Sequence, residues 1–366
     1  MIIIFMGFVV LGLVALQNYL YYKWWNKGLT LDIKFSAKEA FEGETLFIQE
    51  ELSNRKFLPL PWVFAKFQLS RNLKFEGATR NSDAHYQNDL FSVMMYQSIK
   101  RKISFVCSKR GFYRLRNINL ICSNLLHTKR FSCDIQCFSE LTVFPKLLEE
   151  HDKLDVLFKS LDATLLSNSL INPDPFEFKG IREYQPTDPL KDVNFKASAV
   201  AQQLMVNIHA PTSSKRLEII LNLEYYSSFP NLELYEQAIR FAATAAEKFV
   251  SENVKVGFNT NGKDLSTGEN ICIHGGGTAA HLYSVFQALA RIDTTLKVKS
   301  IVPFLENIQD DSAVYLIISS YHEKDFIAAI EDMETRGISY MVVLPVQKGM
   351  RIDMAESEKV KIWEAL

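Results

Sequence analysis

The chain has 366 residues, of which 48% are hydrophobic and 23% are charged, and its formal net charge is -1. This length and composition predict a globular protein of two or three domains. The near-zero net charge gives no electrostatic reason to expect nucleic acid as a partner. The five cysteines are odd in number and irregularly spaced, which is typical of reduced thiols and not of a disulfide framework.

The N-terminal segment MIIIFMGFVVLGLVALQNYLYY carries no charged side chain. A helix rises about 1.5 Å per residue, so roughly 20 apolar residues span the ~30 Å hydrocarbon layer of a membrane. Tyrosines and tryptophans follow at positions 19–25, in the manner of an aromatic belt at a lipid–water boundary. Residues 1–26 are therefore predicted to form a transmembrane anchor, and a buried core helix is the alternative.

The flanks of this segment indicate its orientation. Lys23 and Lys27 lie on the C-terminal side, and the positive-inside rule places that side in the cytoplasm. No basic region precedes the apolar run and no small-x-small site ends it, which argues against a cleaved signal peptide. We expect a single-pass protein of the cell membrane with the bulk of the chain in the cytoplasm.

Residues 29–150 alternate apolar and polar side chains in short runs separated by turn signals. Examples are LDIKFSAKEAFEGETLFIQEEL, LPLPWVFAKFQLS and KRKISFVCSKRGFYRLRNINLICS. Such alternation is typical of half-buried strands, and a series of them predicts an all-β sandwich domain. The region contains no catalytic constellation, which favours a binding surface over chemistry.

Residues 151–200 are predicted to form a helical linker followed by a charged segment. The helical pattern ends at Pro173 and Pro175. The stretch FKGIREYQPTDPLKDVNFKASA follows at 178–199 and mixes arginine, glutamate, aspartate and lysine with tyrosine and phenylalanine. So dense a mixture points to a specific role for this segment.

Residues 201–366 alternate short apolar strands with helices. The predicted strands are LEIILNLE, VKVGFN, AVYLIISS and ISYMVVLP; the predicted helices cover 231–253, with Asn231 as N-cap, about 278–291, and 323–337. This order indicates a mainly parallel sheet covered on both faces, a Rossmann-like α/β domain. Ligands of such sheets bind at the carboxyl ends of the strands, here just after LEIILNL and AVYLII.

The charged stretch resembles a known signature. The matching residues are Gly180, Arg182, Glu183, Tyr184, Pro186, Asp188, Asp192, Lys196, Ala197 and Ala199. They fit the pattern G-x-R-E-Y-x-x-G-D-x-x-R-x-I-x-W-K-x-x-A-R of the bacterial domain of unknown function 58 family. AFEGE, KRGFYRL, LTVFP and QALARI resemble other parts of that family, so the resemblance covers nearly the whole chain. The departures are Thr187 for Gly, Lys191 for Arg, Phe195 for Trp and Val200 for Arg.

The resemblance implies an α+β multidomain protein: an N-terminal transmembrane helix, a β-sandwich and a von Willebrand factor A-like α/β domain. Members of the family are typically membrane-anchored and often accompany MoxR-type AAA+ ATPases. We therefore expect a membrane-anchored scaffold or adaptor, and not an enzyme, with a MoxR-type ATPase as its protein partner. No small-molecule substrate and no cofactor are expected.

Two interpretations of the signature segment stay open. The planar guanidinium of Arg182 suits a carboxylate, either Asp188 or Glu183, and Tyr184 and Phe195 are expected to anchor the segment to the core. The segment would then be a rigid clasp between the β domain and the α/β domain. The alternative is a docking surface for a partner. The residues assigned to either role are Gly180, Arg182, Glu183, Tyr184, Pro186, Asp188, Asp192, Phe195 and Lys196.

No metal site is expected. A von Willebrand A-type site takes Asp-x-Ser-x-Ser after the first strand, and the matching residues here are Asn222, Glu224 and Tyr226. An amide, a longer charged group and a phenol fit poorly where Mg²⁺ needs closely placed oxygens at about 2.0–2.1 Å. Thr278 is the only residue expected to fill a remaining hydroxyl role.

The enzymatic alternative is a hydrolase with a site near Cys272 and His274. These residues are two apart, so on a strand both side chains would point to one face. HGGG at 274–277 is similar to an oxyanion-hole loop of esterases, yet the chain contains no G-x-S-x-G nucleophile elbow and no phosphate-binding loop. No third group that would orient the pair is evident.

Overall fold

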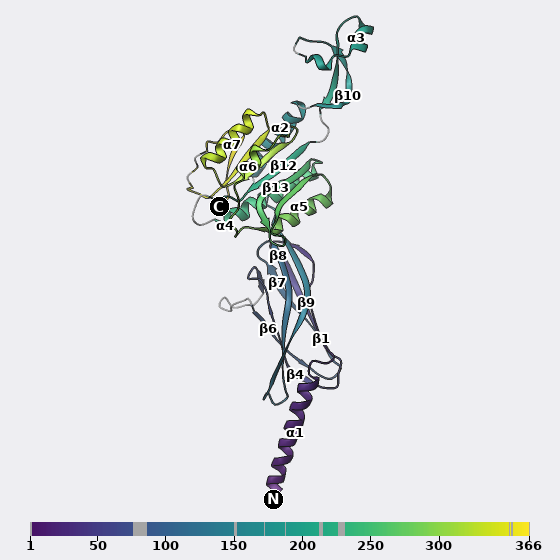
Figure 1. The fold of residues 1–366 in the computed structure, drawn as a ribbon, viewed down its shortest axis with the longest axis vertical. Coiled ribbons are helices and arrows are strands. Elements are labelled where there is room, and N and C mark those ends of the chain that lie inside the picture. Colours follow the sequence, from purple (N-terminus) through teal and green to yellow (C-terminus); the bar gives the residue numbers. More distant parts are fainter. Residues whose placement is uncertain are drawn as a thin grey trace. The chain divides into compact units, whose positions relative to one another are not determined.

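The computed structural model describes residues 2–75, 86–149, 152–171, 173–186, 188–211, 215–225, 231–350, 352 and 354–365. The chain forms two compact units, Met1–Lys146 and Leu147–Leu366 (Figure 1). The first contains an apolar helix and a β-sandwich, and the second a mixed, mostly parallel sheet with helices. The predicted α+β class with these parts in this order is confirmed at that level.

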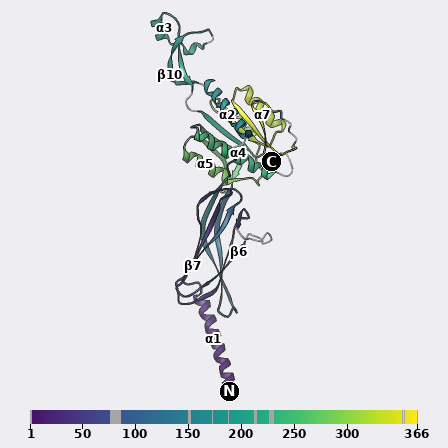
Figure 2. The same cartoon turned by 180° about the vertical axis from the view of Figure 1, so that it is seen from behind.

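The N-terminal helix α1 (Ile2–Trp24) meets one end of the sandwich (Figure 2). Its segment Ile3–Trp24 is long and apolar enough to cross a membrane, with a mean hydropathy of 2.1 in its most apolar window, and none of that window is buried. This exposure argues against the alternative that the segment is a buried core helix. The last turn differs, because Tyr21 is 1% exposed and its hydroxyl donates to the carbonyl of Pro59 at 2.6 Å.

The sandwich consists of a four-stranded sheet in the order β1-β3-β7-β5 and a five-stranded sheet in the order β2-β9-β8-β4-β6. All pairs are antiparallel except β2 with β9. The strands are β1 (Leu29–Phe35), β2 (Glu39–Phe41), β3 (Thr45–Asn54), β4 (Leu60–Gln68), β5 (Leu73–Phe75), β6 (Tyr86–Val93), β7 (Ser98–Cys107), β8 (Gly111–Ser123) and β9 (Arg130–Phe144).

The core of the sandwich follows from the alternation in the sequence. In β1 the side chains of Leu29, Leu31 and Ile33 point inward while those between them are exposed, as a pleated strand requires. All five cysteines are free, which confirms the prediction of unpaired thiols, and Cys107, Cys122 and Cys137 are buried.

One acidic side chain breaks this pattern. Glu50 on β3 is 0% exposed and lies opposite Arg101 of β7 in the register. Arg101 instead pairs with Asp89 at 3.3 Å. Burial, together with the neighbouring charge of Asp89, raises the pKa of Glu50 to about 8. The carboxyl is therefore held neutral inside the sandwich at neutral pH.

The second unit is built on a seven-stranded sheet with the order β14-β13-β12-β16-β17-β18, in which β15 also pairs with β13. β12, β13, β16, β17 and β18 are parallel, and β14 is an antiparallel edge strand. The strands are β12 (Arg216–Asn222), β13 (Lys255–Asp264), β14 (Asn270–Gly276), β15 (Ile292–Asp293), β16 (Val314–Ser319), β17 (Tyr340–Val346) and β18 (Val360–Glu364).

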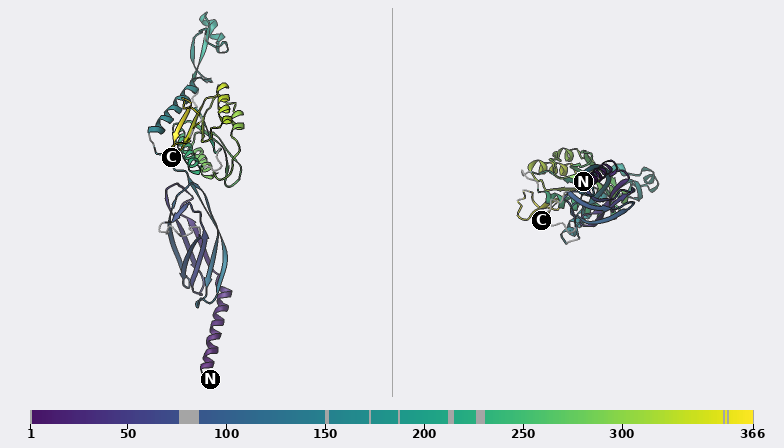
Figure 3. Two further views of the ribbon diagram at one scale, coloured as in Figure 1. Left: turned by 90° about the vertical axis from the view of Figure 1, so that its left-hand side faces the viewer. Right: turned by 90° about the horizontal axis from the view of Figure 1, so that it is seen from below.

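Helices cover both faces of this sheet (Figure 3). They are α2 (Asp152–Ile171), α4 (Leu232–Ser251), α5 (Ala279–Arg291), α6 (Val302–Glu306) and α7 (Lys324–Thr335). The predicted N-cap is confirmed, since Asn231 accepts from the amide of Leu234 at 3.3 Å. The helix expected in a linker, α2, packs on the sheet, with Phe158 stacked on Phe241 of α4.

The signature segment belongs to a separate two-stranded ribbon that the sequence analysis did not predict. β10 (Pro173–Glu183) pairs antiparallel with β11 (Met205–Pro211), with register shifts near Phe178 and Gly180. Between the strands lie the short 3-10 helix η1 (Leu190–Asp192) and α3 (Phe195–Ala201). The prolines and charges of the segment obscure any strand alternation, so periodicity did not reveal the ribbon.

Glu50 predicts how the stability of the sandwich depends on pH. The pKa of Glu50 is raised in the folded state, so the folded protein keeps a proton that the unfolded chain loses above about 4.5. The stability that this bound proton contributes is fully present below that pH. It is lost as the pH rises towards 8, by up to about 1.4 kcal/mol per pH unit. We expect Glu50→Gln to flatten this dependence in urea unfolding of the full chain in detergent.

The neighbouring Glu51 provides the control, because its carboxylate is partly exposed and pairs with Lys100 at 3.2 Å. Glu51→Gln should keep the slope of the wild type. An unchanged slope between pH 5 and 8 in Glu50→Gln would show that another group causes the dependence.

Candidate functional site

The bidentate pair between Arg182 and Asp188 organises the ribbon. Arg182 Nη1 donates to Asp188 Oδ2 and Nη2 donates to Oδ1, both at 2.6 Å. The amide of Gln185 donates to the same carboxylate at 2.8 Å. Of the two carboxylates considered for Arg182 in the sequence, the structure thus selects Asp188, and the pair closes the turn after β10.

The electrostatics of this pair are those of a partly exposed contact. The hydrogen bond from Arg182 and that from the amide of Gln185 lower the pKa of Asp188 below its usual value. The same contact raises the pKa of Arg182. Solvent screens such a pair, so its main contribution is geometric: it holds the turn in one conformation.

Asn194 fixes α3 onto β11, a role that the sequence analysis missed. Its Oδ1 accepts from the amide of Ala197 at 2.9 Å and its Nδ2 donates to Asn207 Oδ1 at 2.8 Å. Ser198 in α3 accepts from the amide of Met205 at 2.8 Å. The signal in the sequence is an asparagine directly before the short helix, where an N-cap is favoured.

The apolar side chains of the ribbon are exposed. Phe195 is 76% exposed, Val200 is 85% exposed and Leu190 is 73% exposed. The expectation that Phe195 anchors the segment to the core is wrong, because Asn194 and Ser198 occupy the side of α3 that faces β11. Tyr184, the other expected anchor, is half-buried.

The remaining signature residues lie around this turn. Gly180 and Asp192 are half-buried, while Glu183, Pro186 and Lys196 are exposed; Thr187 lies outside the described residues. Glu183 accepts from Gln203 Nε2 at 2.8 Å across the ribbon. In the described part of 180–200, the hydrogen bonds join the segment to the ribbon itself, so the clasp closes the ribbon on itself.

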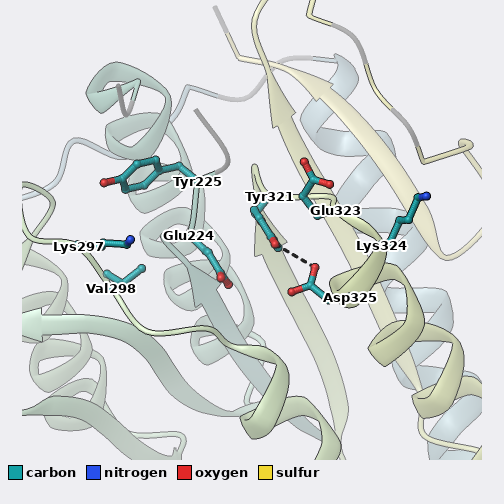
Figure 4. A pocket seen from close by; sticks show the side chains of 8 residues that line it. All are labelled: Glu224, Tyr225, Lys297, Val298, Tyr321, Glu323, Lys324 and Asp325. Carbon is teal, nitrogen blue, oxygen red and sulfur yellow. Dashed lines mark hydrogen bonds between the residues drawn. The ribbon is translucent and has the colours of Figure 1, made fainter. Parts of the chain in front are cut away.

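A cleft of about 490 Å³ lies at the carboxyl ends of the parallel strands (Figure 4). In chain order the six main strands run 3-2-1-4-5-6 across the sheet, which places the topological switch point between β12 and β16. Glu224 and Tyr225 follow β12, and Tyr321 follows β16. The residues that follow these two strands, where the sequence predicts ligand binding, therefore line one cleft.

Asn222, the first of the positions matching the metal site, lies in a neutral hydrogen-bond network. Asn222 is 1% exposed; its Nδ2 donates to Ser319 Oγ at 3.0 Å and its Oδ1 accepts from Asn261 Nδ2 at 2.7 Å. The same Oδ1 accepts from the amide of Glu224 at 3.0 Å. The amide and hydroxyl thus tie the ends of β12, β13 and β16 together.

Two acidic groups of the cleft, Glu224 and Asp325, have protein partners. Glu224 Oε2 accepts from Ser300 Oγ and from the amide of Ile301, both at 3.3 Å. Tyr321 donates its hydroxyl to Asp325 at 2.9 Å, and burial together with this bond raises the pKa of Tyr321. Thr278 caps α5 by accepting from the amide of His281 at 3.2 Å. Tyr226 lies outside the described residues.

Within the described residues, no group of three or more His, Cys, Asp or Glu side chains could hold a metal ion. An asparagine whose two polar atoms are already bonded offers no free ligand at the position where the A-type site takes an aspartate. The cleft itself mixes acidic groups with Lys297 and Lys324, which does not favour a cation. A requirement for Mg²⁺ is thus not indicated by this donor set.

Cys272 and His274 lie on the edge strand β14 and are both exposed, as their spacing predicts. Partial desolvation of the exposed Cys272 thiol by its neighbours, with a contribution from the charge of Glu218, raises the pKa of Cys272, which disfavours a nucleophilic thiolate. The carboxylate of Glu218 extends over Gly257, where only a glycine leaves room for it. Asn259 Nδ2 donates a hydrogen bond to Glu218 Oε2 at 3.3 Å and holds the carboxylate in this position.

Comparisons with known proteins identify no family. No family model matches the chain, and no curated protein matches it. The seventh ScaB type I cohesin from Pseudobacteroides cellulosolvens is 17% identical, with 33% of this chain and 96% of the cohesin covered and a TM-score of 0.23. A CARDB domain from Pyrococcus furiosus is 10% identical, with 32% and 94% covered and a TM-score of 0.21.

A non-cellulosomal cohesin from Archaeoglobus fulgidus is 11% identical, with 31% of this chain and 91% of the cohesin covered and a TM-score of 0.22. Each of these is a low-scoring similarity of fold to a separate domain. None of them bears on what this chain binds.

The Arg182–Asp188 pair predicts local stability in the ribbon. Asp188→Asn removes one charge and should accelerate hydrogen exchange at the amides of Tyr184 and Gln185. In the wild type the folded-state pKa of Asp188 is lower than its ordinary value of 3.8. The protection of these two amides is therefore complete above pH 3.8, and it is lost only as the pH falls through the lower, folded-state pKa. Hydrogen exchange read by mass spectrometry tests this.

Asp192→Asn is the matched control, since Asp192 lies nearby in η1 and, in the described structure, no hydrogen bond or ion pair joins it to Arg182. In Asp192→Asn the amides of Tyr184 and Gln185 should exchange at the wild-type rate. Equal acceleration in both variants would mean that the total charge of the turn, and not the bidentate pair, protects these amides.

The neutral network predicts how the cleft responds to metal. Calorimetric titration of the full chain with Mg²⁺ or Mn²⁺ should show no saturable binding tighter than about millimolar, because Asn222, whose polar atoms are already bonded, replaces the aspartate of the A-type ligand set. Stoichiometric binding that disappears in Glu224→Ala but persists in the exposed control Glu233→Ala would contradict this.

Proposed function

We propose that this chain is a membrane-anchored adaptor that binds a protein partner through its β10–β11 ribbon, with the bulk of the chain in the cytoplasm. By its resemblance to the domain of unknown function 58 family, the proposed partner is a MoxR-type AAA+ ATPase. The proposed role involves no catalysis, no cofactor, no nucleic acid and no small-molecule substrate.

The observation that carries this proposal is the exposed apolar tip of the ribbon, defined as Leu190, Phe195 and Val200. All three side chains are more than 70% exposed, although each is large and apolar. The Arg182–Asp188 pair and the Asn194 cap hold the backbone beneath them in one conformation. An apolar surface on a pre-ordered element is well suited to binding a protein, because little conformational entropy is lost on association.

Three further features support an adaptor at a membrane. Helix α1 has the length and composition of a membrane span, and Lys23 in its last turn and Lys27 just after it lie on the side assigned to the cytoplasm. The strand order 3-2-1-4-5-6 with an antiparallel strand at one edge fits a von Willebrand factor A-like domain. Domains with this order expose the switch point, so the cleft at Glu224 is a second surface available to a partner.

No observation favours the hydrolase alternative. Cys272 and His274 share a face, but in the described residues no hydrogen bond joins them, and the raised pKa of Cys272 opposes its ionisation. The exposed ribbon tip has no role in that alternative. The adaptor therefore accounts for more of the structure.

The tip can be tested by co-purification of the full-length chain from membranes with a MoxR-type ATPase, with and without nucleotide. We expect Phe195→Glu and Val200→Lys to reduce the retained ATPase at least about tenfold, the effect of losing a central apolar contact. Both changes suit α3, because an acidic residue at a helix N-terminus and a basic one at its C-terminus are favourable.

Leu265→Glu is the matched control, because Leu265 is 51% exposed and lies outside the ribbon. It should leave retention unchanged. If wild-type chain in membranes retains no ATPase in either nucleotide state, the proposed partner is wrong. If the tip variants and Leu265→Glu behave alike, the ribbon is not the docking surface.

A further inference from the structure

A pocket of about 540 Å³ lies in the first unit, between the last turn of α1 and the loop that joins β3 to β4. Three cationic side chains line it: Lys27, Arg55 and Lys56. No acidic residue is among the lining residues. In the described part of the chain none of the three cations forms an ion pair, so the pocket carries an unbalanced positive charge.

The two sides of the pocket are held together by the fold. The amide of Arg55 donates to the carbonyl of Gly28 at 2.8 Å, which fixes the loop against the turn that follows α1. Gly28 has a φ of 62°, a left-handed conformation that favours glycine. Tyr21 in the last turn of α1 donates to Pro59 at 2.6 Å. The cations are therefore brought together by backbone geometry on rigid segments.

Lys56 is the most unusual of the three. Its ammonium nitrogen is shielded from solvent and has no hydrogen-bond acceptor in the described structure. Burial lowers the pKa of Lys56 to about 8. A buried ammonium group without an acceptor is unfavourable, and a change of the Lys56 rotamer that brings Nζ into the pocket would let an anion there supply the missing acceptor.

The remaining walls are apolar and aromatic. Leu20 and Trp24 belong to α1, and Phe57 and Tyr96 lie beside them at 73% and 71% exposure. Aromatic side chains of this kind concentrate at the level of lipid headgroups, where one part of the ring is apolar and the other wet. The pocket thus joins a cationic end to an apolar wall that is continuous with the proposed membrane span.

We propose that this pocket binds one anionic phospholipid, with its phosphate between Lys27, Arg55 and Lys56 and an acyl chain along Leu20 and Trp24. The inference rests on the membrane anchoring proposed above. A free phosphate would use only the cations and leave the apolar wall bare. A membrane lipid uses both, and basic pockets beside a span on the cytoplasmic side suit anionic headgroups.

The test compares lipids retained by the full-length chain after extraction from mixed bilayers of phosphatidylcholine and phosphatidylglycerol. Native mass spectrometry measures the ratio of the two bound lipids. We expect the wild type to retain phosphatidylglycerol preferentially, and Arg55→Gln and Lys56→Met each to reduce that preference about fivefold, as expected for one cation near a membrane surface. Methionine removes the charge of Lys56 while keeping the length of its side chain.

Lys23→Gln is the matched control, because Lys23 lies at the same boundary, over the ring of Tyr19, and does not line the pocket. It should keep the wild-type preference. Thermal unfolding in phosphatidylcholine alone checks that all variants fold. In a second arm, inorganic phosphate is added to the detergent-solubilised chain, and it should not displace the bound lipid at millimolar concentration.

Equal retention of the two lipids by the wild type would overturn the inference, as would an equal loss of preference in Lys23→Gln, which would indicate diffuse surface charge. Displacement by inorganic phosphate would show a phosphate site and not a lipid site. Carbonate extraction separates these results from a failure of the anchor. A chain that stays in the membrane without lipid preference refutes only the pocket, whereas a chain that washes off refutes the anchoring as well.

Discussion

The burial of Tyr21 and Trp25 is the contact on which the rest of the first unit depends. These side chains are 1% and 5% exposed, so the last turn of an otherwise exposed apolar helix is part of the sandwich core. Asn124 also donates to Asn18 of the helix at 2.6 Å. Because no flexible linker intervenes, the helix fixes which end of the sandwich lies beside the apolar segment. In the proposed membrane anchoring, the cations beside that junction lie at the depth of the lipid headgroups.

In the second unit, neutral groups occupy the place where a parallel sheet most readily binds a charged ligand. Asn222, Asn261 and Ser319 join three strand ends by hydrogen bonds whose donors and acceptors are nearly all used. A buried network that is fully bonded stabilises a unique arrangement of the strands. The cost is that these atoms are no longer available as ligands. Glu224 likewise accepts hydrogen bonds from Ser300 and Ile301, just before α6.

The ribbon has the opposite arrangement to a core element. Its polar side chains make the internal contacts: Arg182 with Asp188, and Asn194 with Asn207. Its apolar side chains point outward, as Phe195 and Val200 show. A small ribbon cannot bury enough apolar surface to form its own core, so directed polar contacts define its shape. The apolar surface that remains exposed is then available to a partner.

The sequence by itself determined the apolar helix, the sandwich, the parallel strands β12, β13, β16 and β17 with helices α4, α5 and α7, and the Asn231 cap, because these depend on local periodicity and capping. It also predicted that Arg182 would pair with a nearby carboxylate. Only the tertiary structure showed that Arg182 pairs with Asp188 and not with Glu183. It also showed that Phe195 is exposed and that β10 pairs with β11. The pocket at Lys56 likewise needed the fold, since Lys27 and Arg55 are distant in sequence. Contacts of this kind follow from how strands and turns meet in space, which no local pattern encodes.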